Sequence, residues 1–318
     1  MSTQVSKLIL MLTLYRYCNK VYRFINPFFF ITLLSGQTAF TSLDIPYHFR
    51  SIGMSGSGVA DLLSADVSNL NPALLSGSKK ALSLSAVQYP AFIRTHFVEW
   101  RTEWNKWYVS STFKGVNYGD FLERDINGLE LGKFSARDAW ISLAFARKLA
   151  PIADIGFSTG FFQSRIGELQ ALLGLITFGT RVIIPEISTS LGVTIRNIGV
   201  DLDSYTSYKE DIPTSITIGL THELRYLPLL LSVDGFWWRD KSLLKIGGAF
   251  SISKDFFLYL GTSSVRNNLQ IGRLWKDITS GFSMGLGYDI EKMSLGLSLA
   301  NNGVGGIMIG LGFSRILN

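Results

Sequence analysis

Large apolar residues alternate with small or polar residues along much of the chain after residue 80. The alternation is clearest in residues 216–221, 281–288, 293–300 and 307–314. Successive side chains of a β-strand point to opposite faces, so alternation predicts strands in which every second residue faces the same way. The chain after residue 80 is therefore predicted to be all-β.

The small residues in these segments indicate what the second face of each strand meets. In a soluble sheet, the face turned away from the core meets water and is rich in Lys, Glu, Thr and Arg. Here that face carries mainly Gly, Ser, Ala and Thr. Large apolar side chains on one face and small ones on the other favour a membrane barrel with lipid outside and a crowded interior. A soluble all-β domain is the alternative.

Turn signals divide residues 81–318 into about fourteen strands, each long enough to cross a bilayer at a tilt. The predicted strands are 81–89, 95–104, 107–116, 138–148, 152–164, 168–183, 186–198, 213–224, 228–240, 243–253, 255–265, 278–289, 292–301 and 305–317. An even count is what single-chain bacterial barrels require. The predicted fold is an all-β, transmembrane antiparallel β-barrel with a short N-terminal plug that contains a small helix.

The predicted connections differ in length. Residues 148–151, 184–186 and 254–255 are predicted to be tight turns, and residues 117–137, 199–212 and 266–277 longer loops. Within the first of these loops, the pair Asn127-Gly128 is a strong hairpin signal, because both residues tolerate the positive φ of a tight turn. We therefore expect this loop to project as a small ribbon.

Composition supports a membrane protein without spanning helices. Hydrophobic residues make up 47% of the chain and charged residues 17%, and the mean hydropathy is +0.24. The most apolar stretch, residues 24–40, is interrupted by Asn26, Pro27 and Gly36 and is shorter than the roughly 20 apolar residues of a spanning helix. A closed barrel is the other structure that pairs every backbone group within lipid.

Residues 1–39 resemble a secretory signal peptide. Basic Lys20 and Arg23 precede an apolar core at 28–34, and small and polar residues follow up to residue 39. We expect cleavage between residues 36 and 39, and export to the bacterial outer membrane. An uncleaved signal anchor is the alternative.

The same leader accounts for most of the basic charge. Lys7, Arg16, Lys20 and Arg23 precede residue 40 and no Asp or Glu does, so the formal net charge of +6 falls to +2 without them. Because positive and negative charges are nearly balanced in the rest of the chain, no nucleic-acid partner is predicted. The single cysteine, Cys18, also lies in the leader, which excludes a disulfide framework in the mature chain.

Residues 40–80 differ from the rest and are predicted to form a plug segment, followed by the barrel at 81–318. The plug motif consists of Gly53, Gly56, Gly58, Asn71, Pro72 and Ala73. Residues 59–63 are expected to be helical, and Asn71 and Pro72 to cap and stop the plug helix. A phosphate-binding loop is excluded, because the glycines run G-x-x-G-x-G, no strand precedes them and no Lys-Ser/Thr pair follows.

The sequence contains no recognisable catalytic constellation. His48, His96 and His222 lie far apart without metal-ligand spacing, and no G-x-S-x-G nucleophile motif occurs. We therefore expect a non-enzymatic protein with no catalytic residue, no cofactor and no metal site. Some outer-membrane phospholipases and proteases are barrels, so an enzyme remains the minor alternative.

The charged residues of the predicted loops are candidates for partner contact. Arg124, Asp125, Asp211 and Trp275 are the residues that we expect to face a partner protein, if the loops form a docking surface. Ordinary solvated surface is the alternative for each of them. Calcium binding is less favoured, because no D-x-D-x-D-G loop is present.

Several motifs resemble one family of outer-membrane proteins. They lie at residues 50–54, 66–68, 71–75, 117–121, 132–138, 197–199 and 310–313. Together they resemble the PorV/PorQ group of the FadL-like barrels, most closely its PorQ-like members from the type IX secretion system. The resemblance implies a fourteen-stranded plugged barrel that contacts outer-membrane lipid. It also implies a role in anchoring a PorZ-like surface protein, beside a PorV-like barrel and a PorU-like sortase.

Two other functions remain open. A FadL-like channel would pass hydrophobic small molecules and would need an apolar pocket beneath the loops and a gap in the barrel wall. A closed structural barrel could instead bind surface polysaccharide through its loops. The sequence alone does not separate these functions from anchoring.

Overall fold

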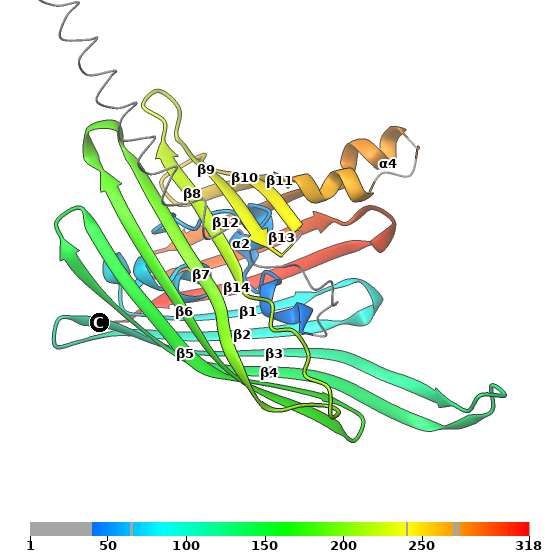
Figure 1. Cartoon of the computed structure of the whole chain (residues 1–318). Helices are drawn as coiled ribbons and strands as arrows, with labels where there is room; N and C mark the ends of the chain where they lie inside the picture. The colour runs from blue at the N-terminus through cyan, green and yellow to red at the C-terminus, as the bar shows by residue number, and fades with distance from the viewer. Residues whose placement is uncertain (1–39, 64–65, 240, 270–271, 273, 318) are drawn as a thin grey trace, which may run out of the picture. The chain divides into compact units, whose positions relative to one another are not determined.

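Fourteen antiparallel strands form a closed barrel in the computed structural model, which describes residues 40–63, 66–239, 241–269, 272 and 274–317 (Figure 1). The strands are β1 (Ala81–Gln88), β2 (Arg94–Trp104), β3 (Trp107–Arg124), β4 (Glu130–Ala150), β5 (Ala153–Ile166), β6 (Leu169–Ile184), β7 (Thr189–Asp203), β8 (Ser215–Glu223), β9 (Leu229–Trp238), β10 (Lys241–Ser251), β11 (Phe256–Ser263), β12 (Phe282–Ile290), β13 (Met293–Asn301) and β14 (Ile307–Ile316). Each strand pairs with its neighbours in sequence, and β1 pairs with β14 from Ala81↔Ile316 to Gln88↔Ile309. The predicted fold class is confirmed. The predicted signal peptide at 1–39 lies outside the described residues.

The two ends of the barrel differ in their connections. We call the end that holds the connections after the odd-numbered strands the loop end, and the opposite end the turn end. At the turn end, Asn105 and Lys106 alone join β2 to β3. At the loop end, the connection after β11 contains the short helices η6 (Ser264–Leu269) and α4 (Leu274–Thr279), where the sequence predicted a plain loop.

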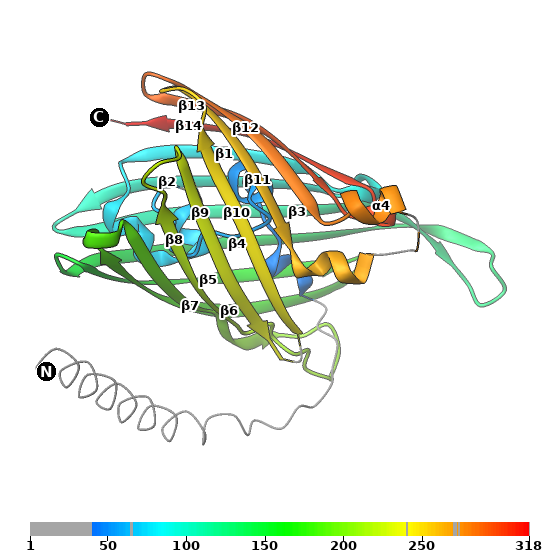
Figure 2. The ribbon, with the colours of Figure 1, turned by 90° about the horizontal axis from the view of Figure 1, so that it is seen from above.

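The hairpin of β3 and β4 extends well beyond the predicted strands. Pairing continues from Asn117↔Arg137 to Arg124↔Glu130, through the segment predicted as a loop. The hairpin projects past the loop end of the barrel, as Figure 2 shows. The predicted ribbon is thus confirmed, but its strands are longer than expected. Charged and glycine residues conceal the alternation in this part of the sequence, so the sequence pattern did not predict strands there.

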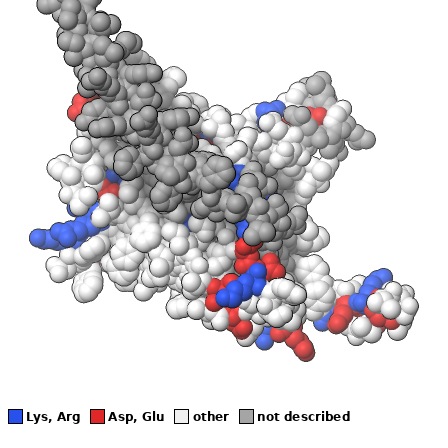
Figure 3. All heavy atoms as spheres, in the orientation of Figure 1, with Lys and Arg blue, Asp and Glu red and all other residues white. Residues whose placement is uncertain are grey.

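The outward and inward faces of the wall follow the sequence alternation. Met284, Leu297 and Leu311 point outward and are 50%, 41% and 58% exposed, whereas inward Ser283 and Ser298 are 5% and 1% exposed. Much of the wall visible in Figure 3 carries no charge, and charged side chains gather near the ends. Among the described helices, none is long and apolar enough to span a membrane.

The segment at 40–80 runs through the barrel interior as a plug. It contains η2 (Thr41–Asp44), α2 (Phe49–Gly53), α3 (Val67–Leu70) and η3 (Pro72–Gly77). Phe40 packs near the loop end against Phe162 of β5, and Lys80 accepts a hydrogen bond from Leu317 at the turn end, where β1 begins. The plug therefore passes along the interior from one end of the barrel to the other.

The predicted helix at 59–63 is wrong. These residues form turns, and the plug helices lie on either side of them. Gly58 has a φ of +121°, and the N–H groups of Gly58 and Val59 both donate to the carboxylate of Asp234 on β9. A contact with the barrel wall therefore fixes the backbone conformation of residues that the local sequence pattern predicted to be helical.

Replacing a lipid-facing residue with a charged one tests the orientation of the wall. We expect Leu297→Arg to lower the free energy of unfolding from lipid vesicles by about 2–4 kcal/mol, because the guanidinium would face acyl chains. Urea titration of the refolded barrel measures this change. The control is Leu129→Arg at the hairpin tip, where we expect little effect. Equal losses in both variants would contradict the assigned orientation.

Candidate functional site

The plug lies directly against glycine residues of the barrel wall. A Cβ atom built on Gly156, Gly192 or Gly261 would lie 2.5 Å from a backbone atom of the plug. The plug atoms at these three contacts belong to Pro72, Val59 and Met54, respectively. Real Cβ contacts are not this close, so larger residues at these wall positions would displace the plug. The wall glycines therefore allow the plug backbone and the sheet to pack without intervening side chains.

Asn71 joins two parts of the plug to the wall. Its side-chain oxygen accepts a hydrogen bond from Ala73 at 3.0 Å, and its amide nitrogen donates to Val59 and Thr180 at 2.8 and 3.0 Å. Pro72 follows as the first residue of η3, where a missing N–H costs no helical hydrogen bond. Asn71 thus ends α3, caps η3 and binds the backbone of β6.

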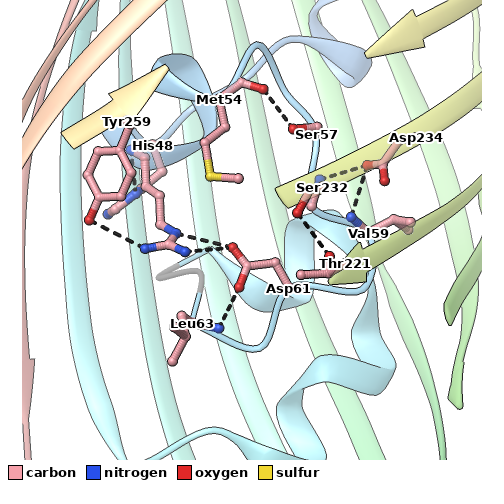
Figure 4. A network of polar contacts seen from close by, with 12 residues as sticks. His48, Met54, Ser57, Val59, Asp61, Leu63, Thr221, Ser232, Asp234 and Tyr259 are labelled. Carbon is pink, nitrogen blue, oxygen red and sulfur yellow. Dashed lines mark hydrogen bonds and ion pairs between the residues drawn. The ribbon is translucent and has the colours of Figure 1, made fainter. Parts of the chain in front are cut away.

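The plug backbone at Gly58 binds a buried carboxylate of the wall. Asp234 accepts hydrogen bonds from Gly58 at 2.7 Å and Val59 at 3.0 Å, as shown in Figure 4. Gly56 and Gly58 both have positive φ, which a side chain would strain. Gly53 lies against Tyr259 of β11. The three predicted plug glycines therefore shape the backbone at its contacts with β9 to β12.

A buried ion pair holds the plug in a fixed shape next to Tyr259. The guanidinium of Arg50 lies 2.8 Å from the Asp61 carboxylate and donates to the Tyr259 hydroxyl at 3.3 Å. Both charged side chains are under a tenth exposed. Since a buried charge without its partner is costly, this pair favours one arrangement of residues 50–61.

Further charged side chains project from the wall into the interior. Lys114 of β3 donates to Asn69 of the plug at 2.8 Å and lies over the Trp140 ring. Arg196 of β7 forms an ion pair with Asp44 of the plug at 3.1 Å. The lumen beside the plug is therefore polar and charged, although the outer wall is apolar.

A β-bulge on β7 directs two consecutive side chains inward. The pairing between β6 and β7 shifts between Ile176 and Phe178, and Asn197 has a φ of +58°. Asn197 is fully buried, and its neighbour Arg196 faces the same interior cavity. Bulges turn a side chain away from the regular alternation, which explains this arrangement. The cavity has a volume of about 10 Å³, which is room for about one water molecule.

An apolar cluster lies at the loop end of the interior. Phe40 of the plug packs between Phe162 and Tyr205, at ring-centroid distances of 5.6 and 5.9 Å. The other members are Leu43, Trp140, Ala171, Leu173, Leu175 and Ile212. A hydrophobic channel would need an apolar pocket beneath its loops. Apolar side chains are present at this place, but those of the plug fill the space between them.

Two of the predicted partner residues lie at the tip of the β3–β4 hairpin. Arg124 forms an exposed ion pair with Glu130 at 3.0 Å. Asp125 accepts hydrogen bonds from the N–H groups of Leu129 and Asn127, and these bonds lower the pKa of its carboxyl. Both residues therefore shape the turn at the hairpin tip.

The other two predicted partner residues lie on different connections. Asp211, between β7 and β8, forms an ion pair with Arg239, which follows β9. Trp275 belongs to α4 in the connection after β11. The structure therefore places the four predicted residues on three parts of the loop end, and their role in partner contact stays a prediction.

The interior charges are the feature that sequence reasoning missed. Glu99, Lys114 and Asp234 stand in the inward phase of β2, β3 and β9, beside small or polar inward residues such as Thr95, Thr112 and Ser232. Glu99 accepts a hydrogen bond from the N–H of Ser68 of the plug at 3.3 Å. A charged residue in the inward phase was the available signal that the lumen packs against a polar partner.

The histidines do not form a site. His48 is buried in the plug, His96 faces outward on β2 and His222 lies 2.9 Å from the Thr189 hydroxyl. Within the described ranges, no three His, Cys, Asp or Glu side chains lie close enough together to hold a metal ion.

Comparison with known proteins identifies the fold. No protein-family profile matches the chain, and no curated protein gives a significant sequence match. Among solved structures, the chain is similar to the toluene transporter TodX of Pseudomonas putida, with a TM-score of 0.59 and 14% identity over 86% of this chain and 98% of TodX. The toluene transporter TbuX of Ralstonia pickettii has the same TM-score and coverage at 13% identity. The CymD monoaromatic hydrocarbon channel also matches at 0.59, with 11% identity and the same coverage.

At these identities, the likeness establishes the fold and leaves the function open. The predicted fourteen-stranded barrel is confirmed, whereas membership of the FadL-like family and of its PorV/PorQ group stays a prediction. All three similar proteins are named as transporters or channels rather than enzymes.

A glycine substitution tests the contact between plug and wall. We expect Gly192→Ala to lower the free energy of unfolding by about 1–3 kcal/mol, because its methyl group would overlap the backbone of Val59. The control is Gly132→Ala in the projecting hairpin, where nothing lies within 4 Å of the added atom. Urea unfolding of both variants measures the difference. A plug that lies loosely in the lumen would tolerate both substitutions equally.

Proposed function

We propose that this chain is a non-enzymatic outer-membrane barrel of the type IX secretion and attachment complex, in which it anchors a surface protein. The observation that carries the proposal is the β3–β4 hairpin, which extends beyond the loop end and exposes apolar side chains. These side chains are Phe121, Leu122, Ile126, Leu129 and Leu131. Long loops of bacterial barrels face the cell exterior, so the hairpin would meet surface proteins.

The hairpin is suited to binding because it is both apolar and ordered. Ile126 is fully exposed and Leu129 is 66% exposed, although water surrounds this part of the chain in the free protein. A cluster of exposed apolar side chains gains free energy when a partner covers it. The hydrogen bonds to Asp125 and the Arg124–Glu130 ion pair hold the tip in shape, which reduces the entropy lost on binding.

The filled interior also supports an anchor. The plug is joined to the wall by Asn71, Asp234 and the Arg196–Asp44 ion pair, and the cavity at Arg196 holds about one water molecule. A protein that serves as a fixed base for another protein needs no wide lumen. The partner types, a PorZ-like surface protein with a PorV-like barrel and a PorU-like sortase, come from the sequence resemblance.

Crosslinking of the tagged barrel in intact outer membranes tests the anchor. We expect mass spectrometry of the captured complex to recover a PorZ-like protein or a sortase with the wild type. The double variant Ile126→Lys with Leu129→Lys should recover at least about tenfold less of that partner, because charges replace the apolar contact. The control is Tyr226→Lys, which changes an equally exposed side chain at the turn end. Recovery of the barrel alone would contradict the proposal.

The second candidate is a channel for hydrophobic small molecules. It is favoured by the fold shared with TodX, TbuX and CymD, and by the apolar cluster around Phe40 beneath the loops. For this function, Phe40 and Leu43 would have to leave the cluster. The polar lumen below it, with Lys114 and Arg196, is a poor path for an apolar solute.

Toluene binding separates the two candidates. Removing the Phe40 ring by Phe40→Ala would leave an apolar cavity, and such cavities stay dry and take up small aromatic molecules. If the barrel is an anchor, calorimetry should detect toluene binding to Phe40→Ala and none to the wild type. If the barrel is a channel, the wild type itself should bind toluene. Phe236→Ala, which removes a buried ring outside the cluster, controls for nonspecific uptake.

A further inference from the structure

The outer wall of the barrel has a hollow on the side formed by β11 to β14, β1 and β2. It is shallow and open to the lipid side, with a volume of about 730 Å³. Leu84, Leu297, Leu311, Phe313 and Tyr288 line it with outward-facing side chains. A barrel wall is normally convex towards lipid, so a hollow of this size needs a structural cause.

The cause lies on the inner side of the same strands. Gly296 of β13 and Gly312 of β14 lie directly against the Phe49 ring of the plug, where a Cβ atom would overlap it. A Cβ atom on Gly287 of β12 would lie 2.6 Å from the Tyr259 hydroxyl. All three glycines also line the hollow from the outside. With no side chain on these residues, the wall is thin and comes close to the plug, and its outer surface is recessed.

The loop-side border of the hollow is polar and cationic. His96 lines the hollow from β2, and Arg94 lies one step nearer the loop end on the same outward face. Arg94 donates to Gln88 at 3.3 Å, and in the described part of the chain neither Arg94 nor His96 forms an ion pair with a carboxylate. The outward face of β2 therefore changes from apolar to ionisable at this border.

The wall beneath this border is short as well as recessed. Gln88 pairs with Arg94, and six residues further along β1 Leu82 pairs with Arg315 of β14. At about 3.3 Å per residue, the polar pair of Gln88 and Arg94 lies roughly 20 Å along the strand from Arg315. Because barrel strands tilt by about 35–45°, this length spans roughly 15 Å along the membrane normal, which is less than the apolar band of about 25 Å on typical barrels. A lipid headgroup at this wall would therefore lie level with Arg94 and His96.

We propose that this hollow is a binding site for one outer-leaflet lipid, with an acyl chain in the apolar recess and an anionic phosphate at Arg94 and His96. Acyl chains surround the wall in any membrane, and the recess gives one of them more contact than the convex surface elsewhere. The cationic border selects for a phosphorylated headgroup by charge complementarity. This site lies on the lipid-facing wall and does not depend on whether the barrel is an anchor or a channel.

Native mass spectrometry of the full barrel, released from micelles that contain phosphatidylglycerol or phosphatidylcholine, tests the site. We expect one retained phosphatidylglycerol per wild-type barrel. Ala86→Phe should remove it, because Ala86 faces outward into the hollow and a ring would fill the recess. Arg94→Gln should weaken retention about fivefold, as the loss of one cation near an anionic headgroup predicts. His96→Gln should weaken retention as well, because it removes the imidazole that lines the hollow beside the headgroup.

The matched control is Val193→Phe, which adds a ring to the outward face of β7, away from the hollow. We expect it to retain the lipid as the wild type does. Equal retention of phosphatidylglycerol by wild type, Ala86→Phe and Val193→Phe would overturn the proposal, since it would indicate ordinary annular lipid. Wild-type barrels that are released as lipid-free dimers, dissociated by Ala86→Phe alone, would overturn it too, because a second copy would then occupy the hollow.

Discussion

The structure depends on the requirement that every backbone N–H and C=O group in contact with lipid be paired. An unpaired group in the hydrocarbon costs several kcal/mol, so an open sheet edge cannot face the acyl chains. The pairing of β1 with β14, from Ala81↔Ile316 onward, removes the last edge. Closure then determines which residues face outward, because a shift of one residue would turn every side chain to the opposite face. The alternation along the chain is the consequence of this closure.

Closure also creates an interior that must be filled. The inward residues of the wall are mostly small or polar, and they leave space that the plug occupies. Where plug backbone meets wall, as at Gly156 and Gly192, glycine permits contact that no other residue allows. Where polar groups meet, as between Asp234 and the N–H groups of Gly58 and Val59, hydrogen bonds offset the loss of water. The plug is thus the core of a protein whose apolar surface faces outward.

The strands could be predicted from the sequence because lipid imposes a simple rule on their outward face. All fourteen predicted strands correspond to observed ones, and most of their ends agree within a few residues. The requirement for apolar outward residues ends at the membrane boundary. Beyond it, the β3–β4 hairpin continues as strands through residues 117–124 and 130–137, where charged side chains hide the alternation.

The position of the plug in the chain could be predicted from the sequence, but the conformation of its backbone could not. Its glycines and Asn71 were recognisable as positions of special backbone geometry, and the structure gives each a contact with the wall or within the plug. Their partners, such as Asp234 for Gly58, lie more than a hundred residues away, and no local pattern connects them. The helix predicted at 59–63 failed for this reason, since its backbone conformation depends on β9.

The interior chemistry bears on function more directly than the fold does. One barrel architecture serves several functions, and the similar structures of hydrocarbon channels share only 11–14% of their residues with this chain. An apolar solute would be stabilised in the cluster around Phe40, but it would then meet Lys114 and Arg196 in a lumen filled by the plug. Displacing that plug would break the Arg196–Asp44 ion pair and leave Arg196 without this partner in the interior. The hairpin tip has no such barrier, because its apolar side chains are already exposed and ordered. A function at the outer surface therefore requires less change in this structure than a function through it.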